Sequence, residues 1–339
     1  MKKNIFKGKT VLVTGASGSI GSALTLQLIK LGCKSVRAFS NDENGLYELS
    51  NLVETIYPNY ANKEIFTKLR LTKIRYIYSD IRDINRCIKA SENVDIIIHA
   101  AALKHVLICE LNPEEAVQTN VIGTQNIVKA AILNKVDRFL LISTDKVVNS
   151  STLMGSTKKL CEQLVINSND ILGNLKTKLS VVRFGNVVGS RGSVIPKFIN
   201  QAKSNRPITV HGKSMNRYVM TISDAIDLTL VAIEKMKGRE IFILKSMGII
   251  NIFDLANGIK KYFKSKSQIK VIGKIFSEKY SENLVSPEEI KNLSSISERL
   301  YVLKSKNKNT SKNNKNFIKK PKPLSSKKII ELLIKENLL

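Results

Sequence analysis

Two ionisable side chains stand next to each other after an apolar segment of this chain. Asp145 and Lys146 follow the run Phe139–Ser143, and Thr144 lies directly before them. An acid beside an amine can donate one proton and accept another, which is what general acid–base catalysis requires. Each charge affects the protonation of the other, so the two groups form a coupled pair. The alternative interpretation is an ion pair in a surface loop.

A glycine-rich turn near the start of the chain predicts a nucleotide site. Residues Thr14–Gly21 read T-G-A-S-G-S-I-G and follow the apolar run Thr10–Thr14. Glycines here permit a tight turn and a close approach of the backbone to a pyrophosphate, and the helix that follows offers unpaired N–H groups. Glycines that only shape a turn are the alternative. The cofactor-binding residues expected in this turn are Thr14, Gly15, Ser17, Gly18, Ser19, Ile20 and Gly21.

The ends of the following strands supply further cofactor contacts. A site for NAD normally has an acid at the tip of the second strand, whereas Ser40 and Asn41 leave room here for the 2′-phosphate of NADP. We therefore expect NADP, with NAD as the alternative if Asp42 turns back toward the ribose. Small side chains after a later strand would let the cofactor pass close to the backbone. The additional cofactor-binding residues expected are Ser40, Asn41, Asp80, Ile81, Ala100, Ala101 and Ala102.

Short apolar runs alternate with helical segments through the first half of the chain. This alternation predicts βαβ units with right-handed crossovers, and hence an α/β fold with a doubly wound parallel Rossmann sheet. The strands expected are Thr10–Thr14, Ser35–Phe39, Ile74–Tyr78, Asp95–His99, Phe139–Ser143 and Leu179–Phe184. We assign residues 1–185, with parts of 216–250, to this nucleotide-binding domain and residues 186–300 to a smaller C-terminal substrate-binding lobe. Residues 301–339 form a Lys/Asn-rich tail with a short terminal helix.

The composition is that of a basic chain with enough apolar residues for a large core. The chain has 339 residues, of which 43% are hydrophobic, and a formal net charge of +27. Such a charge suits anionic partners, including acidic lipid or a diphosphate, but much of it lies in the tail, so we expect no specific nucleic acid. No apolar run reaches the ~18–20 residues of a membrane span, and the first residues do not resemble a signal peptide. We expect a cytoplasmic protein, without a metal because the Cys and His spacing matches no metal site.

Further segments of distinctive sequence accompany the glycine-rich turn and the acid–amine pair. They are His99–Val106, Thr119–Thr124, Met154–Lys158, Arg183–Val187, Gly189–Val194, Arg217, and Glu278 with Lys279 and Glu282. With them, residues 8–288 resemble the extended short-chain dehydrogenase/reductases, and more narrowly the UDP-N-acetylglucosamine 4,6-dehydratases and related capsule-biosynthesis enzymes. Members of that family carry Tyr or Met at the position of Met154. This sequence departs from the family pattern at Ser277, where Gly is common, and at Ser150, where Pro is common.

The resemblance implies the dehydration of a UDP-hexosamine through a 4-keto sugar, with elimination of water across C5–C6 and return of the hydride to C6. Lys146 would be the base for the C5 proton, Asp145 the acid for the leaving hydroxyl, and Lys158 would bind the nicotinamide ribose. Met154 cannot take the C4 hydroxyl proton, so Thr144, a water molecule, or Asp145 through water would do so. The substrate-binding residues implied are Lys104, Met154, Asn186, Arg191, Arg217 and Glu278.

The stereochemistry and the partners are also expectations from the resemblance. We expect inversion at C5, because similar enzymes that retain configuration carry a membrane N-terminus that this sequence lacks. The partners expected are a UDP-sugar and further copies of the chain in a homo-oligomer. A UDP-hexose 4-epimerase, which would return the hydride to C4, is the nearest alternative. A non-catalytic basic binding protein on the same scaffold is another, which steep salt-dependent binding of nucleic acid would support.

Overall fold

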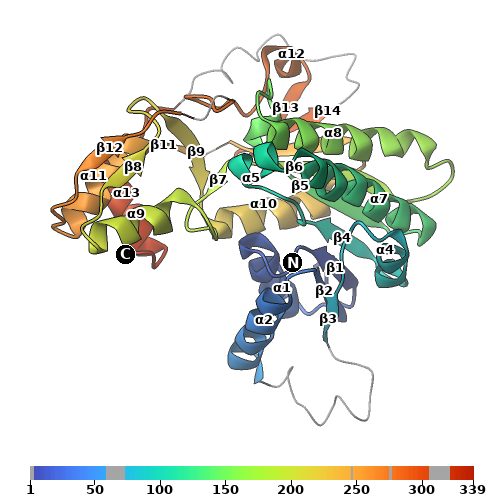
Figure 1. The fold of residues 1–339 in the computed structure, drawn as a ribbon. Helices are drawn as coiled ribbons and strands as arrows, with labels where there is room; N and C mark the ends of the chain where they lie inside the picture. The colour runs from blue at the N-terminus through green and yellow to red at the C-terminus, as the bar shows by residue number, and fades with distance from the viewer. Residues whose placement is uncertain (1–3, 59–72, 246, 275–276, 305–320) are drawn as a thin grey trace.

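The computed structural model of the chain is built around one large sheet (Figure 1). The structure describes residues 4–58, 73–245, 247–274, 277–304 and 321–339. Within these residues the sheet has nine strands in the order β13-β14-β10-β6-β5-β4-β1-β2-β3. The strands from β3 to β10 run parallel, and the hairpin β13-β14 is added antiparallel beside β10. The doubly wound parallel sheet predicted from the sequence is therefore confirmed.

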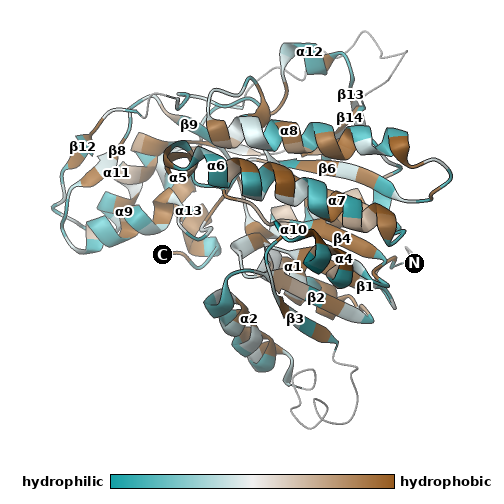
Figure 2. Ribbon diagram, turned by 45° about the vertical axis from the view of Figure 1, so that its right-hand side comes forward, coloured by the Kyte–Doolittle hydropathy of each residue, from teal (hydrophilic) through white to brown (hydrophobic). Residues whose placement is uncertain are grey.

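The strands of the large sheet are short and mostly buried, as expected for parallel strands that are covered on both faces. They are β1 (Thr10–Thr14), β2 (Ser35–Ser40), β3 (Ile74–Tyr78), β4 (Ile96–His99), β5 (Arg138–Thr144), β6 (Lys178–Phe184), β10 (Glu240–Leu244), β13 (Leu293–Ser297) and β14 (Leu300–Lys304). The ends of β1 to β6 lie within one residue of the strands predicted from apolar runs. Figure 2 shows the central strand β4 in the hydrophobic colour.

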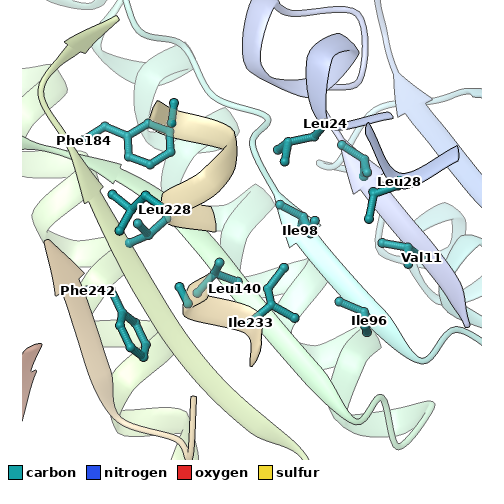
Figure 3. Close-up of a cluster of buried hydrophobic side chains, with 14 of the residues drawn as sticks. Val11, Leu24, Leu28, Ile96, Ile98, Leu140, Phe184, Leu228, Ile233 and Phe242 are labelled. Carbon is teal, nitrogen blue, oxygen red and sulfur yellow. The ribbon is translucent and has the colours of Figure 1, made fainter. Parts of the chain in front are cut away.

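Helices cover both faces of the sheet. One face carries α1 (Ser19–Lys30), α2 (Glu43–Ile56) and α10 (Ile222–Lys235), and the other carries α4 (Ile84–Ser91), α7 (Gly123–Leu133) and α8 (Leu153–Asn167). Alternate residues of a strand point to opposite faces, so Ile96 and Ile98 pack on the first side while Ile97 packs on the second. Figure 3 shows the first cluster, in which Leu28 of α1 and Ile233 of α10 meet these strand residues.

Short helices and turns lie near the carboxyl ends of the strands. They are α5 (Val106–Leu111), α6 (Pro113–Ala116), a π-helical segment (Val117–Ile122) and a 3₁₀ turn (Asp145–Val147), whereas a second 3₁₀ turn (Ser168–Ile171) lies at the amino end of β6. The turn Asp145–Val147 leaves β5 directly, and Thr144 caps it by accepting a hydrogen bond from the backbone N–H of Lys146. The acid–amine pair therefore stands at the carboxyl edge of the sheet.

A smaller lobe stands beside this edge (Figure 1). Its strands are β7 (Asn186–Val187), β9 (Asn216–Met220) and β11 (Gly248–Asn251) in one sheet, and β8 (Ile208–Val210) with β12 (Ile269–Val271) in another. Its helices are α9 (Val194–Lys203), α11 (Ile252–Tyr262) and α13 (Ser326–Lys335), which share one apolar core. The short helix α12 (Pro287–Ile290) precedes β13.

The hairpin β13-β14 and the terminal helix belong to other parts of the fold than the sequence analysis assigned them to. The hairpin β13-β14 extends the large sheet, although we placed residues 293–300 in the lobe and 301–304 in the tail. Its strand Leu293–Ser297 reads L-S-S-I-S, which is too polar to suggest a strand, and its place is set by the pairing of β14 with β10. The terminal helix is α13, and it buries Ile329 and Leu333 in the lobe. The tail residues 305–320 lie outside the described residues.

No helix in the described part of the chain has the length and apolar character that crossing a membrane requires.

Candidate active site

A cavity of about 1300 Å³ lies along the carboxyl ends of the parallel strands, between the large sheet and the lobe. The strand order reverses between β1 and β4, and doubly wound sheets bind ligands at that point. Apart from Thr14 and Asp145, every residue that we predicted for the site lines this cavity. Thr14 and Asp145 are fully buried directly behind the lining. The fold thus gathers residues that are far apart in the sequence into one site.

The glycine-rich turn forms one wall of the cavity. Gly15 has a φ of 66°, and a Cβ at this position would lie 2.7 Å from the backbone nitrogen of Ala101. Only glycine therefore allows the end of β1 to approach the segment after β4 this closely. Gly18 caps α1 without a side-chain hydrogen bond, so the N–H groups of the first helical turn are not used by a capping side chain. This arrangement fits a pyrophosphate.

A buried network holds the ends of β1 and β4 together. The Nδ1 atom of His99 lies 2.6 Å from Oγ1 of Thr14, and its Nε2 lies 3.0 Å from Oγ1 of Thr124 on α7. Thr14 Oγ1 also accepts a hydrogen bond from the backbone N–H of Ala101. Burial, together with the charge of Lys158, lowers the pKa of His99 to about 3. His99 is therefore neutral and has a structural role, and Thr14 shapes the wall from behind.

The far end of the cavity holds the residues that follow β2 and β3. The hydroxyls of Ser17 and Ser40 lie 2.7 Å apart, and Asn41 donates to the carboxylate of Asp80 at 3.2 Å. Asp42 is occupied on both oxygens. Its Oδ1 caps α2, and its Oδ2 accepts from the guanidinium of Arg191 at 3.2 Å.

Arg191 comes from the lobe and reaches the nucleotide-binding half of the cavity. Its backbone N–H donates to Oγ of Ser19 at 2.9 Å, and its carbonyl accepts from Nζ of Lys104 at 2.7 Å. Burial, with the charge of Arg191 as a smaller cause, lowers the pKa of Lys104. We predicted both residues as substrate contacts, and the structure places the Arg191 guanidinium beside Asp42 at the end of β2.

The acid–amine pair stands at the centre of the cavity wall. Oδ1 of Asp145 accepts from the hydroxyl of Thr144 at 3.0 Å and from Nζ of Lys146 at 3.0 Å. Oδ2 of Asp145 has no hydrogen-bond partner among the described residues. The amine of Lys146, which is 18% exposed, also donates to Oδ1 of Asn186 at 3.4 Å. Because Asp145 is fully buried, the alternative of a surface ion pair is wrong.

Lys158 and Met154 complete the wall beside this pair. Nζ of Lys158 donates to the backbone carbonyl of Ile142 at 2.7 Å, and burial lowers its pKa. Met154 packs against Cys109 and Ala116, so its thioether serves as an apolar surface. Asn120 in the π-helical segment exchanges two hydrogen bonds with the backbone of residue 103. This amide therefore fixes the segment that carries Ala102 and Lys104.

The lobe side of the cavity contains a charged cluster that the sequence only partly indicated. The carboxylate of Glu278 accepts from the guanidinium of Arg217 at 2.7 Å and lies 2.7 Å from Nδ1 of His211. We predicted Arg217 and Glu278 as substrate contacts but assigned no role to His211. Glu282 was likewise not assigned. Burial raises the pKa of Glu282, the charge of Lys146 opposes this, and the charge of Asp145 adds to it. A pairing between such distant segments leaves no local signal in the sequence.

The sheet, the glycine-rich turn and the C-terminal lobe define an extended short-chain dehydrogenase/reductase. Residues 11–304 match the model of a family described as "Polysaccharide biosynthesis protein". The chain belongs to this family, as the sequence motifs predicted. This membership places the protein among the enzymes that modify sugar nucleotides, so the alternative of a non-catalytic binding protein is set aside.

Several known proteins are similar to the chain over most of its length. A protein of Methanocaldococcus jannaschii, named as an uncharacterized membrane protein, is 42% identical over an alignment that covers 97% of this chain and 96% of that protein. A UDP-glucose 4-epimerase of Rickettsia rickettsii is 38% identical over 84% of this chain and 80% of its own length. The solved structure of Pen from Bacillus thuringiensis has a TM-score of 0.88 and 34% identity over 99% of both chains.

A more distant solved structure shares the fold alone. It is DesIV, a dTDP-glucose 4,6-dehydratase from Streptomyces venezuelae, which was solved with NAD and a second ligand bound. Its TM-score is 0.68 at 19% identity, over 81% of this chain and 88% of that chain.

Proposed function

We propose that the chain is an NADP-dependent UDP-N-acetylglucosamine 4,6-dehydratase that inverts C5. The observation that carries this function is the Asp145–Lys146 pair, because it places an amine on the cavity wall with a carboxylate bonded behind it. Elimination of water needs one group to remove the C5 proton and another to protonate the leaving hydroxyl. Epimerisation at C4 needs neither. The choice of UDP-N-acetylglucosamine rests on the motif resemblance.

The residues of the cavity fit a dinucleotide. The glycine-rich turn would hold the pyrophosphate, the segment Ala100–Ala102 would allow close passage along the backbone, and Lys158 would bind the nicotinamide ribose. The bound cofactor would accept a hydride from C4 of the sugar and return it at C6. Lys158, positively charged, would favour the transfer by stabilising negative charge at the sugar oxygen.

Two contacts at the end of β2 support NADP over NAD. The carboxylate of Asp42, which would otherwise hold the ribose hydroxyls, is bonded to the N-terminus of α2 and to Arg191. The Arg191 guanidinium at this end of β2 would then bind a 2′-phosphate, since arginine binds phosphate in a bidentate manner. Ser40 and Asn41 are small enough to admit that phosphate.

A relay through Thr144 accounts for the proton that Met154 cannot accept. The hydroxyl of Thr144 lines the cavity and donates to Asp145, so it can pass the C4 hydroxyl proton to the carboxylate behind it. The oxygens on C4 and C6 flank C5 on the sugar, so the same relay can deliver this proton to the departing 6-hydroxyl. The water that leaves then carries the C4 hydroxyl proton, and Asp145 returns to its starting state.

Lys146 takes the C5 proton, which the neighbouring C4 ketone makes acidic. Its amine lines the cavity and is oriented by Asp145 and Asn186. After the hydride has returned to C6, inversion requires that C5 receive its proton on the opposite face, which we assign to a water molecule admitted from the cavity. Lys146 then releases its proton to solvent. The atoms balance as loss of one water, and C5 of the product carries a hydrogen from solvent.

Mass spectrometry of the product formed in D₂O tests this function. Purified protein with NADP and UDP-N-acetylglucosamine should give a nucleotide sugar that has lost one water and gained one deuterium at C5. To determine the configuration at C5, the reaction is repeated in H₂O and the C4 ketone of the product is reduced, after which the H4–H5 coupling constant in the proton NMR spectrum should show inversion. A product without loss of water, formed at a measurable rate, would exclude the dehydratase.

A UDP-hexose 4-epimerase is the second candidate, because relatives that are 38% identical carry the name UDP-glucose 4-epimerase. The same experiment separates the two reactions. An epimerase would convert UDP-glucose or UDP-N-acetylglucosamine into a product of unchanged mass with the opposite configuration at C4.

A further inference from the structure

Residues 277–282, here called the strap, cross from the lobe to the loop that follows the Asp145–Lys146 turn. At one end, the carbonyl of Ser277 accepts a hydrogen bond from Oγ of Ser151 at 2.7 Å. The hydroxyl of Ser277 donates to Glu110 at 3.2 Å. Near the other end, Ser281 forms a β-bridge with Asn216 at the start of β9. The strap is therefore tied both to the helices beside the site and to the lobe.

Lys279 makes the central contact of the strap. Its amine donates to the backbone carbonyl of Val148 at 2.8 Å and to the backbone carbonyl of Asn149. It lies 3.9 Å from the carboxylate of Glu282, and the side chain is largely covered. One ammonium group thus binds two consecutive carbonyls that directly follow the turn Asp145–Val147.

The loop that Lys279 holds continues directly from the turn Asp145–Val147. Asn149 has a φ of 46°, in the left-handed region that asparagine adopts more readily than most residues with a side chain. The backbone N–H of Val148 donates to the carbonyl of Asp145 at 3.2 Å. A shift of residues 148–149 would therefore also move the turn that carries Asp145 and Lys146.

The residue next to Lys279 in the strap faces the cavity. Glu278 is bonded to Arg217 and His211, which line the lobe side of the same cavity. Adjacent residues of one extended segment thus contact the substrate side of the cavity and the turn that carries the proton-handling pair. A ligand that engages Arg217 would act on the strap at a position next to the Lys279 contact.

We propose that Lys279 is a positioning residue for the Asp145–Lys146 turn, and that the strap links the lobe side of the cavity to this turn. Lys279 is not among the residues that line the cavity, and it acts through the carbonyls of Val148 and Asn149. The direction of its effect on turnover rests on the proposed dehydratase function. Its effect on the backbone of the turn does not depend on that function.

The test compares three variants of the full-length protein. Lys279→Met keeps the length of the side chain but removes its hydrogen-bond donors, and Lys279→Arg keeps charge and donors. Lys274→Met is the matched control, because Lys274 bonds the strap through the carbonyl of Glu278 and stacks over Tyr280 without contacting residues 148–149. Each variant is measured for kcat and KM with UDP-N-acetylglucosamine, for NADP affinity, and for hydrogen–deuterium exchange of the peptide that covers residues 143–152.

A misplacement of about 1 Å in a catalytic group can reduce the rate by about 100-fold. We therefore expect Lys279→Met to lower kcat by about tenfold to 100-fold, while KM and NADP affinity stay within about twofold. Amide exchange in residues 143–152 should become faster in Lys279→Met. Lys279→Arg should recover most of kcat, and Lys274→Met should match the wild type in every measurement.

The two hypotheses fail in different ways. If the wild type releases no water from UDP-N-acetylglucosamine, the proposed function fails, and hydrogen exchange still tests the contact. Unchanged exchange in residues 143–152 of Lys279→Met would overturn the positioning role. A rise in KM with unchanged kcat would also overturn it, because that pattern would make Lys279 a substrate contact.

Discussion

The amine of Lys146 lies 3.0 Å from the carboxylate of Asp145, and the two groups differ in their access to the cavity. Lys146 lines the cavity, whereas Asp145 is fully buried behind it and is reached through Thr144. This geometry gives the two residues different proton transfers. Lys146 can accept the proton from C5 directly, whereas Asp145 exchanges protons with the sugar oxygens through the hydroxyl of Thr144. The difference gives the two residues separate experimental signatures.

Lys146→Ala should abolish the incorporation of deuterium at C5 and leave the binding of NADP unchanged. The amine is the only group that we assign to the C5 proton, and general base catalysis contributes about 100-fold to 10,000-fold in rate. The rate at which C5-deuterated product forms in D₂O, followed by mass spectrometry, and calorimetric titration with NADP measure the two effects. Lys159→Ala is the control. Lys159 is a partly exposed residue of α8, and its amine lies 3.5 Å from the carboxylate of Glu289 in α12. A rate of deuterium incorporation at C5 in Lys146→Ala that equals the wild-type rate would remove this role.

Gly15→Ala should weaken NADP binding by at least about tenfold, because the added methyl group would meet the backbone of Ala101. Gly8→Ala is a control for backbone strain. Gly8 also has a positive φ, of 76°, but a Cβ there would have no neighbour within 4 Å. Both variants should lose about 1–2 kcal/mol of stability from the left-handed conformation. Equal NADP affinity in the two variants would show that the contact between Gly15 and Ala101 is unimportant.

The buried guanidinium of Arg183 should contribute more to stability than any exposed ion pair of the chain. Arg183 donates to both oxygens of Glu162 and of Glu289, and both Arg183 and Glu162 are almost inaccessible to solvent. Arg183→Met leaves the Glu162 carboxylate buried without its partner, which costs about 3–5 kcal/mol. Urea unfolding should show this loss. Arg239→Met, which breaks a half-exposed pair with Asp170, should cost at most about 1 kcal/mol. Similar losses in the two variants would contradict this account.

The sequence was sufficient to predict the parts of the fold that carry a local signal. Apolar runs marked β1 to β6 because strands covered on both faces must be apolar at consecutive positions. The hairpin β13-β14 gave no such signal, since its position is decided by pairing with the edge of β10. The terminal helix was predicted from its own periodicity, whereas its docking in the lobe depends on the apolar face of α11.

The candidate site was predictable to a similar extent. Asp145 and Lys146 were found because they are adjacent in sequence and follow a strand. His211, Glu282 and Lys279 were not assigned a role, because each works through a segment that is distant in the sequence. The approach of the Arg191 side chain to Asp42 was missed for the same reason.

Arg191→Met should lower the affinity for NADP by about tenfold and change the affinity for NAD by less than about twofold. The guanidinium lies beside Asp42 at the end of β2, and one charge-assisted hydrogen bond contributes about 1.5–3 kcal/mol. Calorimetric titration with both nucleotides measures the difference. Arg299→Met serves as the control, because Arg299 is exposed and pairs with Asp224. An equal loss for NADP and NAD would place Arg191 on a part of the cofactor that both share.

The burial of neutral His99 should make the protein less stable as the pH falls below about 6.5. The unfolded chain protonates this imidazole with a pKa of about 6.5, whereas burial holds the pKa of His99 in the folded protein at about 3. The folded state therefore binds fewer protons, and its stability is present above pH 6.5 and is lost progressively as the pH falls toward 3. Between pH 7 and pH 5 this group should remove about 2 kcal/mol from the free energy of unfolding. His99→Gln, which has no titrating group, should lack this part of the pH dependence while it keeps that of all other residues. Urea unfolding of both proteins at several pH values gives the difference, and parallel pH profiles would show that His99 is protonated in the folded state.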